Sequence, residues 1–422
     1  MQLNYGLKTV DFSPPENLAW HILHKTSVKS TEEEKDILSG AIDSLFDQLK
    51  DRIAGHSKLL VIVPDHTRRC GLEKILPLMA DRFESTGGDV EFLVANGSHV
   101  IQPDGIIEDM VGPLINRRFK ISQHDCRDEH SLLYCGTTSR GTPVWLNRKV
   151  KEADYIITIG GVLYHYFAGF GGGPKMIVPG IAGYETIRVN HRRTIDESTG
   201  KFHRFSREGD IHSNPVYLDL AEAVGLLPNT LSFQVVLDTG NRFAHAVAGP
   251  VLETHRQICA RVKDIYGIPV AEKADFVVAS AGGYPTDANL IQSHKAIHHA
   301  FQAVKKDGVL FVLAECREGI GSRTFLPYFD HGSSSSIGSS LLDDYQINGH
   351  TALALKSKTE QAKIIFLSDL APDIVAKTGM IPATSMEQAM NIANFPLKTE
   401  ATGYILPDAH VTVPEFVHQS SR

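Results

Sequence analysis

Short, uninterrupted runs of apolar residues alternate along the chain with longer stretches of helical periodicity. The runs at 58–64, 90–95 and 155–159 are rich in Leu, Val and Ile, which is typical of strands buried on both faces of a sheet. Residues 37–49 place apolar side chains at every third or fourth position, which predicts an amphipathic helix packed on that sheet. This alternation predicts an α/β fold built on doubly wound, largely parallel sheets.

The same alternation begins again in the last third of the chain. After a Gly-Ile-Pro connector, fresh apolar runs follow at 276–279, 309–314 and 364–368. A serine-rich segment at 331–340 interrupts this series, and its composition predicts a mobile loop. The pattern indicates a second sheet of the same kind.

A chain of 422 residues is long for a single domain. We therefore expect two α/β domains, residues 1–265 and residues 275–399, with the active site in the cleft between them. We expect the tail, from about residue 400 to residue 422, to pack back on the first domain.

Chemically versatile side chains follow three of the predicted strands directly. The segments that begin there are Asp65-His66-Thr67-Arg68, then Asn96-Gly97-Ser98-His99, and a glycine-rich stretch from His165 to His191. Open α/β sheets bind their ligands at the carboxyl ends of the strands. These three segments are therefore the first candidates for a functional site.

The glycine-rich stretch contains Lys175 between Pro174 and Met176, with no charged neighbour in sequence. Desolvation lowers the pKa of a lysine and makes its amine nucleophilic. Two phosphate-binding patterns do not fit, because Lys175 is not followed by Ser or Thr and the glycines do not have the G-x-G-x-x-G spacing. From the residues alone, an ordinary loop with a solvated lysine remains equally open.

The other candidates also have ordinary structural explanations. Thr67 and Arg68 precede a predicted helix and could bind an anion, or could be a helix cap and a surface arginine. His99 could be a base, although a single histidine after a strand more often only forms a hydrogen bond. Gln292 and Lys295 share one face of a predicted helix, where they could attract an anion or simply be solvated.

Composition excludes several classes of protein. The net charge of −7 provides no basic surface for nucleic acid. No apolar run is long enough to cross a membrane, and the first residues do not resemble a signal peptide. The five cysteines are scattered without a C-x-x-C pair, which favours free thiols in a reducing cytoplasm. The sequence is compatible with a homo-oligomer and does not decide the oligomeric state.

Five motifs in register resemble the lactate racemase family, whose members use a nickel-pincer nucleotide. The motifs are D-H-T-R at 65–68, G-S-H at 97–99, H-Y-F-A-G-F-G-G-G-P-K at 165–175, N-H at 190–191 and Q-x-x-K at 292–295. The resemblance implies that Lys175 carries the cofactor (a pyridinium thioamide thiocarboxylic acid mononucleotide) through a thioamide, and that His191 ligates its nickel. It also implies catalytic roles for His99 and His165, and cofactor binding by Asp65, Thr67, Arg68, Gln292 and Lys295.

The function implied by this resemblance is an isomerase that inverts the C2 carbon of a 2-hydroxy acid by proton-coupled hydride transfer. Enzymes that build the cofactor would be its partners. The chain departs from the family where Val100 replaces an arginine and Ile291 replaces a tyrosine. These two changes favour a substrate other than lactate, such as a sugar acid or a dicarboxylate.

Two functions from other classes compete with this hypothesis. A zinc-dependent hydrolase could use the histidines, and would contain zinc at stoichiometric occupancy and no adduct on the lysine. A non-catalytic protein that binds a nucleotide or a sugar acid would be stabilised by its ligand without turnover.

Overall fold

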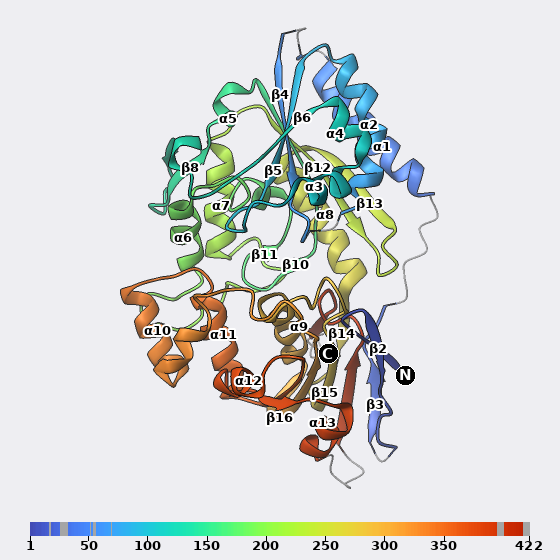
Figure 1. Cartoon of the computed structure of the whole chain (residues 1–422), viewed down its shortest axis with the longest axis vertical. Coiled ribbons are helices and arrows are strands. Elements are labelled where there is room, and N and C mark those ends of the chain that lie inside the picture. Colours follow the sequence, from blue (N-terminus) through green and yellow to red (C-terminus); the bar gives the residue numbers. More distant parts are fainter. Residues whose placement is uncertain are drawn as a thin grey trace, which may run out of the picture. The chain divides into compact units, whose positions relative to one another are not determined.

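The chain folds into two compact units, each of which contains one six-stranded sheet (Figure 1). The first unit comprises Ser27–Arg193 and Phe205–Ile265, and the second comprises Met1–Thr26, Thr194–Arg204 and Tyr266–Arg422. The computed structural model describes residues 1–16, 18–25, 33–50, 52–53, 56–68, 70–394 and 401–416.

The sheet of the first unit has the strand order β13-β12-β9-β4-β5-β6 and is parallel except for the edge strand β13. Its first half contains α1 (Glu34–Lys50), β4 (Lys58–Pro64), α2 (Leu72–Ser85), β5 (Asp89–Ala95), α3 (Asp104–Val111), α4 (Pro113–Arg118), β6 (Lys120–Gln123), η1 (Glu129–Ser131), β7 (Leu132–Thr137), β8 (Pro143–Asn147) and α5 (Lys149–Glu152). Its second half contains β9 (Tyr155–Gly161), β10 (Tyr164–His165), β11 (Gly169–Phe170), η2 (Gly173–Met176), α6 (Tyr184–Arg192), α7 (Pro215–Gly225), β12 (Thr230–Leu237), β13 (Phe243–Pro250) and α8 (Val251–Tyr266).

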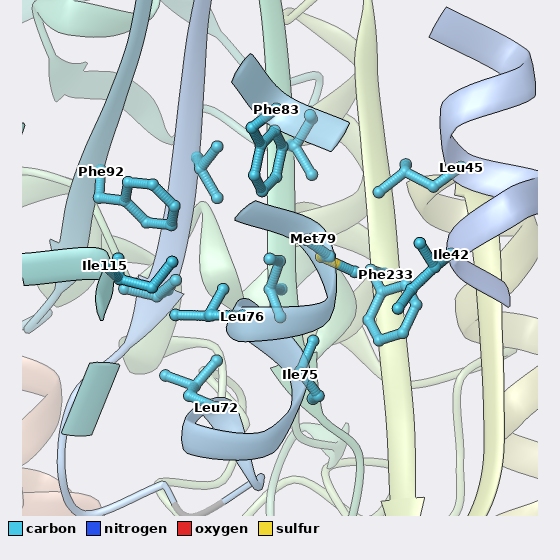
Figure 2. Packing of buried hydrophobic residues seen from close by; sticks show 14 of the residues in the cluster. Ile42, Leu45, Leu72, Ile75, Leu76, Met79, Phe83, Phe92, Ile115 and Phe233 are labelled. Atoms are coloured by element: carbon cyan, nitrogen blue, oxygen red, sulfur yellow. The ribbon is translucent and has the colours of Figure 1, made fainter. Parts of the chain in front are cut away.

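Helices cover both faces of this sheet. In Figure 1, α1, α2 and α4 lie to the right of β4, and α5, α6 and α7 lie to the left. On the α1–α2 side, a continuous apolar core buries Leu45, Met79, Phe83, Phe92 and Phe233 (Figure 2). Because β4 is buried along nearly its whole length, its carboxyl end is held rigidly within the sheet.

The sheet of the second unit has the order β18-β17-β16-β15-β19-β3, and all its pairings are parallel. Its first elements are β1 (Gln2–Tyr5), β2 (Lys8–Asp11), β3 (Ala19–Ile22), β14 (Gly267–Val270), β15 (Ala274–Ser280), α9 (Leu290–Gln302), β16 (Val304–Leu313) and η3 (Leu326–His331). The rest are α10 (Ser334–Asp343), α11 (Gly349–Thr359), β17 (Lys363–Leu367), α12 (Pro372–Lys377), β18 (Ile381–Ala383), α13 (Met386–Ala393), β19 (Thr402–Leu406) and β20 (Val413–Phe416).

The predicted α/β fold with two doubly wound sheets is confirmed, but the predicted domain limits need correction. The tail does not pack on the first unit, because β19 is inserted between β15 and β3 in the sheet of the second unit. Its segment Tyr404-Ile405-Leu406 is buried there. Burial removes these apolar side chains from water, which favours a position inside a sheet over an exposed one. The first 26 residues and Thr194–Arg204 also belong to the second unit. Residues 400 and 417–422 of the predicted tail lie outside the described residues.

The serine-rich segment predicted as a mobile loop forms most of α10. Ser333 caps this helix by accepting a hydrogen bond from the Ser336 amide (3.1 Å). Ile337 and Leu341 are fully buried on its inner face. One capping hydroxyl and two buried apolar side chains outweigh the weak helix propensity of serine.

Candidate active site

The candidate site lies where the strand order of the first unit reverses. From β4 the chain proceeds outward to β5 and β6, and it then returns to β9 on the other side of β4. Such a switch point opens a crevice at the carboxyl ends of the strands, where ligands bind. The segments after β4, β5 and β9 carry seven of the nine predicted site residues, of which His191 lies on helix α6.

Asp65 and His99 form a hydrogen-bonded pair at this edge. The buried Asp65 accepts hydrogen bonds through Oδ1 from the Thr67 amide (2.9 Å) and hydroxyl (2.6 Å), and its Oδ2 lies 2.5 Å from Nδ1 of His99. A carboxylate can only accept, so Nδ1 of His99 carries the proton and Nε2 carries the lone pair. The His99 side chain is 38% exposed. It therefore has the protonation pattern and the access that a general base needs.

The ionised form of Asp65 is stabilised by its neighbours. Burial alone would raise the pKa of this carboxyl group. The hydrogen bond and charge of His99, the charge of Arg68 and the hydrogen bond of Thr67 together outweigh burial and lower the pKa well below its ordinary value. Asp65 therefore stays ionised and keeps His99 in one orientation at neutral pH.

The loop after β9 requires glycine at its tightest points. Gly173 has φ +49°, and a Cβ at this position would lie 2.3 Å from the Cδ2 atom of His255. A Cβ at Gly180 would lie 2.1 Å from the carbonyl oxygen of Met176. The chain can therefore fold back tightly around Lys175, which lies in the short helix η2.

Lys175 is half-buried and has a strongly altered amine. Burial, with a smaller contribution from the charge of Arg68, lowers its pKa to about 7. Its Nζ atom lies 3.1 Å from Nε2 of His165 and 4.9 Å from the ring centroid of Phe167. A substantial fraction of this amine is neutral, and so nucleophilic, at physiological pH.

The partners of His165 indicate its tautomer. The Ala168 amide donates to Nδ1 over 3.4 Å, so Nδ1 of the neutral ring carries the lone pair and Nε2 carries the proton. Nε2 then donates to the neutral amine of Lys175. This arrangement agrees with the lowered pKa of the lysine.

Phe167 connects three of the predicted residues. Its ring lies 4.4 Å from the ring of His165 and 5.0 Å from the ring of His191, measured between centroids, and the Lys175 amine lies over it. His191 itself is buried on α6. The structure therefore gathers His165, Lys175 and His191 around one aromatic side chain.

Thr67 and Arg68 have different surroundings. The Thr67 hydroxyl proton is donated to Asp65, so Thr67 primarily supports that carboxylate. Arg68 is exposed, with its Nη1 atom 3.4 Å from the Thr67 hydroxyl oxygen. Its charge reaches both Asp65 and Lys175. Arg68 is therefore the residue of this segment that is best suited to contact an anionic group.

Gln292 and Lys295 belong to the second unit, in the first turns of α9. The Lys295 amine donates to Oε1 of Gln292 over 2.8 Å. Asn289 caps this helix by accepting from the Gln292 amide. The predicted pair is therefore formed within its own unit.

Sequence reasoning did not identify Phe167, Asn190 or His255 as parts of this arrangement. His255 is fully buried on α8, and its Nε2 atom lies 3.0 Å from the carbonyl oxygen of Gly171. Because a carbonyl only accepts, Nε2 carries the proton, and Nδ1 accepts from the Tyr217 hydroxyl. No local sequence pattern marks His255, which is 80 residues from Lys175 along the chain. Phe167 and Asn190 do stand inside the motifs at 165–175 and 190–191.

Within the described residues, no group of three or more His, Cys, Asp or Glu side chains has an arrangement that could hold a metal ion. His124, in the polar segment HDCRDEH, is buried and lies 3.0 Å from the Ala182 carbonyl oxygen through Nε2. It has a structural role there.

No helix in the described part of the chain is long and apolar enough to cross a membrane.

Comparisons with known proteins agree across both units. Residues 5–201 match the model of the lactate racemase N-terminal domain, and residues 270–413 match that of the lactate racemase C-terminal domain. Lactate racemase of Thermoanaerobacterium thermosaccharolyticum is 28% identical over 420 residues, 97% of each chain. Lactate racemase of Lactiplantibacillus plantarum is 27% identical over 398 residues, 91% of this chain and 90% of the relative.

Solved structures give the same result. The apoprotein of lactate racemase from Thermoanaerobacterium thermosaccharolyticum superposes with a TM-score of 0.88 at 27% identity, over 98% of this chain and 99% of that chain. A protein from Thermotoga maritima shares the fold with a TM-score of 0.70 at 15% identity, over 93% of this chain and 100% of that chain.

Proposed function

Because the chain belongs to the lactate racemase family and is an isomerase of the racemase class, we propose that it inverts the C2 carbon of a 2-hydroxy acid with a nickel-pincer nucleotide tethered to Lys175. The observation that carries this proposal is the Lys175 amine. Its pKa is lowered to about 7, and it shares the ring of Phe167 with His165 and His191.

The residues present fit such a cofactor. Lys175 provides a nucleophilic amine for a covalent link, His191 provides a ring nitrogen for nickel, and Arg68 provides a positive charge for a phosphate. A nickel bound mainly by the nucleotide needs few protein ligands, which agrees with the finding that the described residues contain no three-ligand cluster. When bound, the group supplies an acceptor for the hydride from the C2 carbon of the substrate.

The chain's own residues then manage the protons. His99, held by Asp65 with its Nε2 lone pair available, takes the proton of the substrate hydroxyl group on one side. His165 would serve the other side: with the Lys175 nitrogen in a thioamide, Nε2 of His165 would no longer have a basic amine to donate to, and the ring could take the tautomer with its lone pair on Nε2. Inversion at C2 requires the hydride to return to the opposite face of the planar 2-keto acid, so the oxygen that is protonated then faces the other side of the site, where a second base can act. We propose His99 and His165 as these bases.

The family suggests the substrate class, and two departures from its motifs argue against lactate as the individual substrate. The curated relatives are named lactate racemases. In this chain Val100 stands where the resemblance expects an arginine, and its side chain is 79% exposed. Ile291 replaces the expected tyrosine one position before Gln292. We propose a 2-hydroxy acid other than lactate, such as a sugar acid or a dicarboxylate.

The cellular setting follows from the cofactor and the cysteines. Enzymes that build the nucleotide are the partners that this proposal requires. All five cysteines are free thiols, which suits a reducing cytoplasm. The zinc-hydrolase alternative is disfavoured by the lack of a ligand cluster among the described residues. The binding-protein alternative is disfavoured by His99, which Asp65 holds with its Nε2 lone pair available.

The test is the mass of the peptide that contains Lys175, measured together with metal content after expression beside the cofactor-building enzymes. We expect a mass increment on Lys175 and about one nickel per chain. A racemase of known activity, expressed in the same cells, reports whether the cofactor was made. An unmodified Lys175 without nickel, in cells where that control is loaded, would overturn the proposal. A loaded protein is then screened for inversion of 2-hydroxy acids.

A further inference from the structure

The side chain of Asn190 on α6 has a defined orientation. Its Nδ2 atom lies 2.8 Å from Oδ2 of Asp219 and 3.2 Å from the carbonyl oxygen of Val216. Both of these atoms only accept hydrogen bonds, so the amide nitrogen must face them. The amide oxygen Oδ1 therefore faces the other way, where it lies 3.2 Å from Nδ1 of His191.

This orientation determines the tautomer of His191. An amide oxygen only accepts, so Nδ1 of His191 must carry the proton in this contact. In the neutral ring, Nε2 then carries the lone pair. A metal-binding histidine usually donates its other ring N–H to an oxygen acceptor, which fixes the ring and raises its basicity as a ligand.

We infer that Asn190 and Asp219 are positioning residues that hold His191 as the Nδ1–H tautomer and present its Nε2 atom to the nickel. This inference rests on the proposed function for the role of His191 as a nickel ligand, but not for the tautomer of its ring. The chain of hydrogen bonds from Asp219 through Asn190 to His191 is present in the protein without any cofactor.

Asp219 is a suitable anchor because every neighbour restrains it. It is 1% exposed on α7. Its Oδ1 accepts from the Thr138 hydroxyl (2.6 Å) and its Oδ2 from the Thr142 hydroxyl (2.8 Å), while Nε of Arg193 lies 3.2 Å from Oδ2. A buried carboxylate with this many donors and a paired cation has a single well-defined position.

Helix α7 also supports a second neighbour of the His191 ring. Asn214 caps α7 and donates through Nδ2 to the carbonyl oxygen of Phe167 over 2.9 Å. The Phe167 ring packs against His191 at an interplanar angle of 67°. Helix α7 and its cap therefore restrain His191 indirectly in two ways, through Asp219, which holds Asn190, and through Asn214, which holds the backbone of Phe167.

The direct test is the tautomer of His191 in the cofactor-free protein, from two-bond ¹⁵N–¹H correlation spectra of ¹⁵N-histidine-labelled protein. The pH is mildly alkaline, so that histidine is neutral, and the His191→Gln variant assigns the signal. We expect a protonated Nδ1 in the wild type. A protonated Nε2 in the wild type would overturn the inference.

Two variants separate positioning from general stability. Asn190→Leu and Thr142→Val each remove one donor to Oδ2 of Asp219, but only the first removes the acceptor for His191. We expect Asn190→Leu to lose the Nδ1–H signal, and Thr142→Val to keep it. Retention of Nδ1–H in a folded Asn190→Leu protein would contradict the inference. If Asn190→Leu does not fold, the wild-type spectrum decides alone.

Nickel retention provides the second readout. In loaded protein challenged with a chelator, we expect Asn190→Leu to lose nickel about 10–100-fold faster than the wild type, and Thr142→Val to match the wild type. Equal loss from both variants would show that Asn190 contributes only stability. A wild type that never carries nickel would overturn the proposed function, whereas a loaded wild type with protonated Nε2 would overturn only this inference.

Discussion

Two buried aspartates, one in each unit, show how similar sheets can serve different purposes. Asp65 follows β4 in the first unit, and Asp287 follows β15 in the second. Both are almost inaccessible to solvent, at 4% and 1% exposure. Asp65 accepts hydrogen bonds from Thr67 and from the ring of His99. Asp287 accepts through Oδ2 from two backbone amides, those of Gly6 (2.7 Å) and Glu315 (3.0 Å).

The difference lies in what each carboxylate holds in place. Asp287 connects the β1–β2 turn to the loops after β15 and β16, so its charge is used to fix backbone. Asp65 orients a side chain that remains 38% exposed. We therefore expect a reactive site at the carboxyl end of β4, where the polar groups restrain other side chains, rather than after β15, where they restrain the backbone.

Each unit also contains a lysine in apolar surroundings. We expect the largest loss of activity when the lysine of the first unit is replaced, and none when the lysine of the second unit is replaced. Lys175 lies over Phe167, and Lys358, which is 6% exposed, lies over Phe301 and donates to the Ala354 carbonyl oxygen. We expect Lys175→Ala to abolish the mass increment and to lower racemase activity by roughly 10³-fold or more. We expect Lys358→Met to keep both. Mass spectrometry and polarimetry of loaded proteins measure these outcomes. An active Lys175→Ala enzyme would show that Lys175 does not differ from Lys358 in carrying the cofactor.

Substitution of the two buried aspartates, Asp65 and Asp287, should have different effects: the first on kcat and the second on the free energy of unfolding. An asparagine at position 65 can donate to Nδ1 of His99, which would move the ring proton to Nε2 and remove the base. We therefore expect Asp65→Asn to lower kcat about 10²–10⁴-fold in folded protein. Asp287→Asn should instead lower the free energy of unfolding by about 1–3 kcal/mol and leave kcat unchanged. Urea unfolding and steady-state kinetics on both variants measure the two effects.

The opposite pattern would break this distinction. If Asp287→Asn lowered kcat as strongly as Asp65→Asn in equally folded samples, the carboxylate of the second unit would also serve the reaction. If Asp65→Asn affected only stability, His99 would not depend on this carboxylate.

Much of this arrangement was predictable because it depends on local sequence. The apolar runs predicted the strands, and parallel strands place their following loops at one edge. The uncharged sequence neighbours of Lys175 suggested desolvation of its amine, and burial in the structure lowers its pKa in that direction. Both sheets have the predicted doubly wound form.

The rest depends on contacts between segments that are distant in sequence. The pairing of Asp65 with His99 requires the register of β4 on β5, which aligns Pro64 with Ala95. The support of the glycine-rich loop by His255 requires α8 to pack beneath it. The tail was placed wrongly because nothing in a single apolar strand indicates which of two sheets it joins, and β19 joins β15 and β3.

The smallest effect tests the cause of the low pKa of Lys175. In the cofactor-free protein, we expect acetylation of Lys175 to rise with pH through about 7 and then level off, whereas lysine peptides of the second unit, the internal reference, should keep rising toward about 10.4. Since the unfolded chain binds this proton up to about pH 10.4, the contribution of Lys175 to the free energy of unfolding should increase between about pH 7 and pH 10.4.

Arg68→Ala should raise the apparent pKa of Lys175 by less than about one pH unit, because burial is the larger cause of the lowered pKa. A return of Lys175 to the profile of the reference peptides in Arg68→Ala would show instead that charge, rather than the surrounding protein, distinguishes this amine.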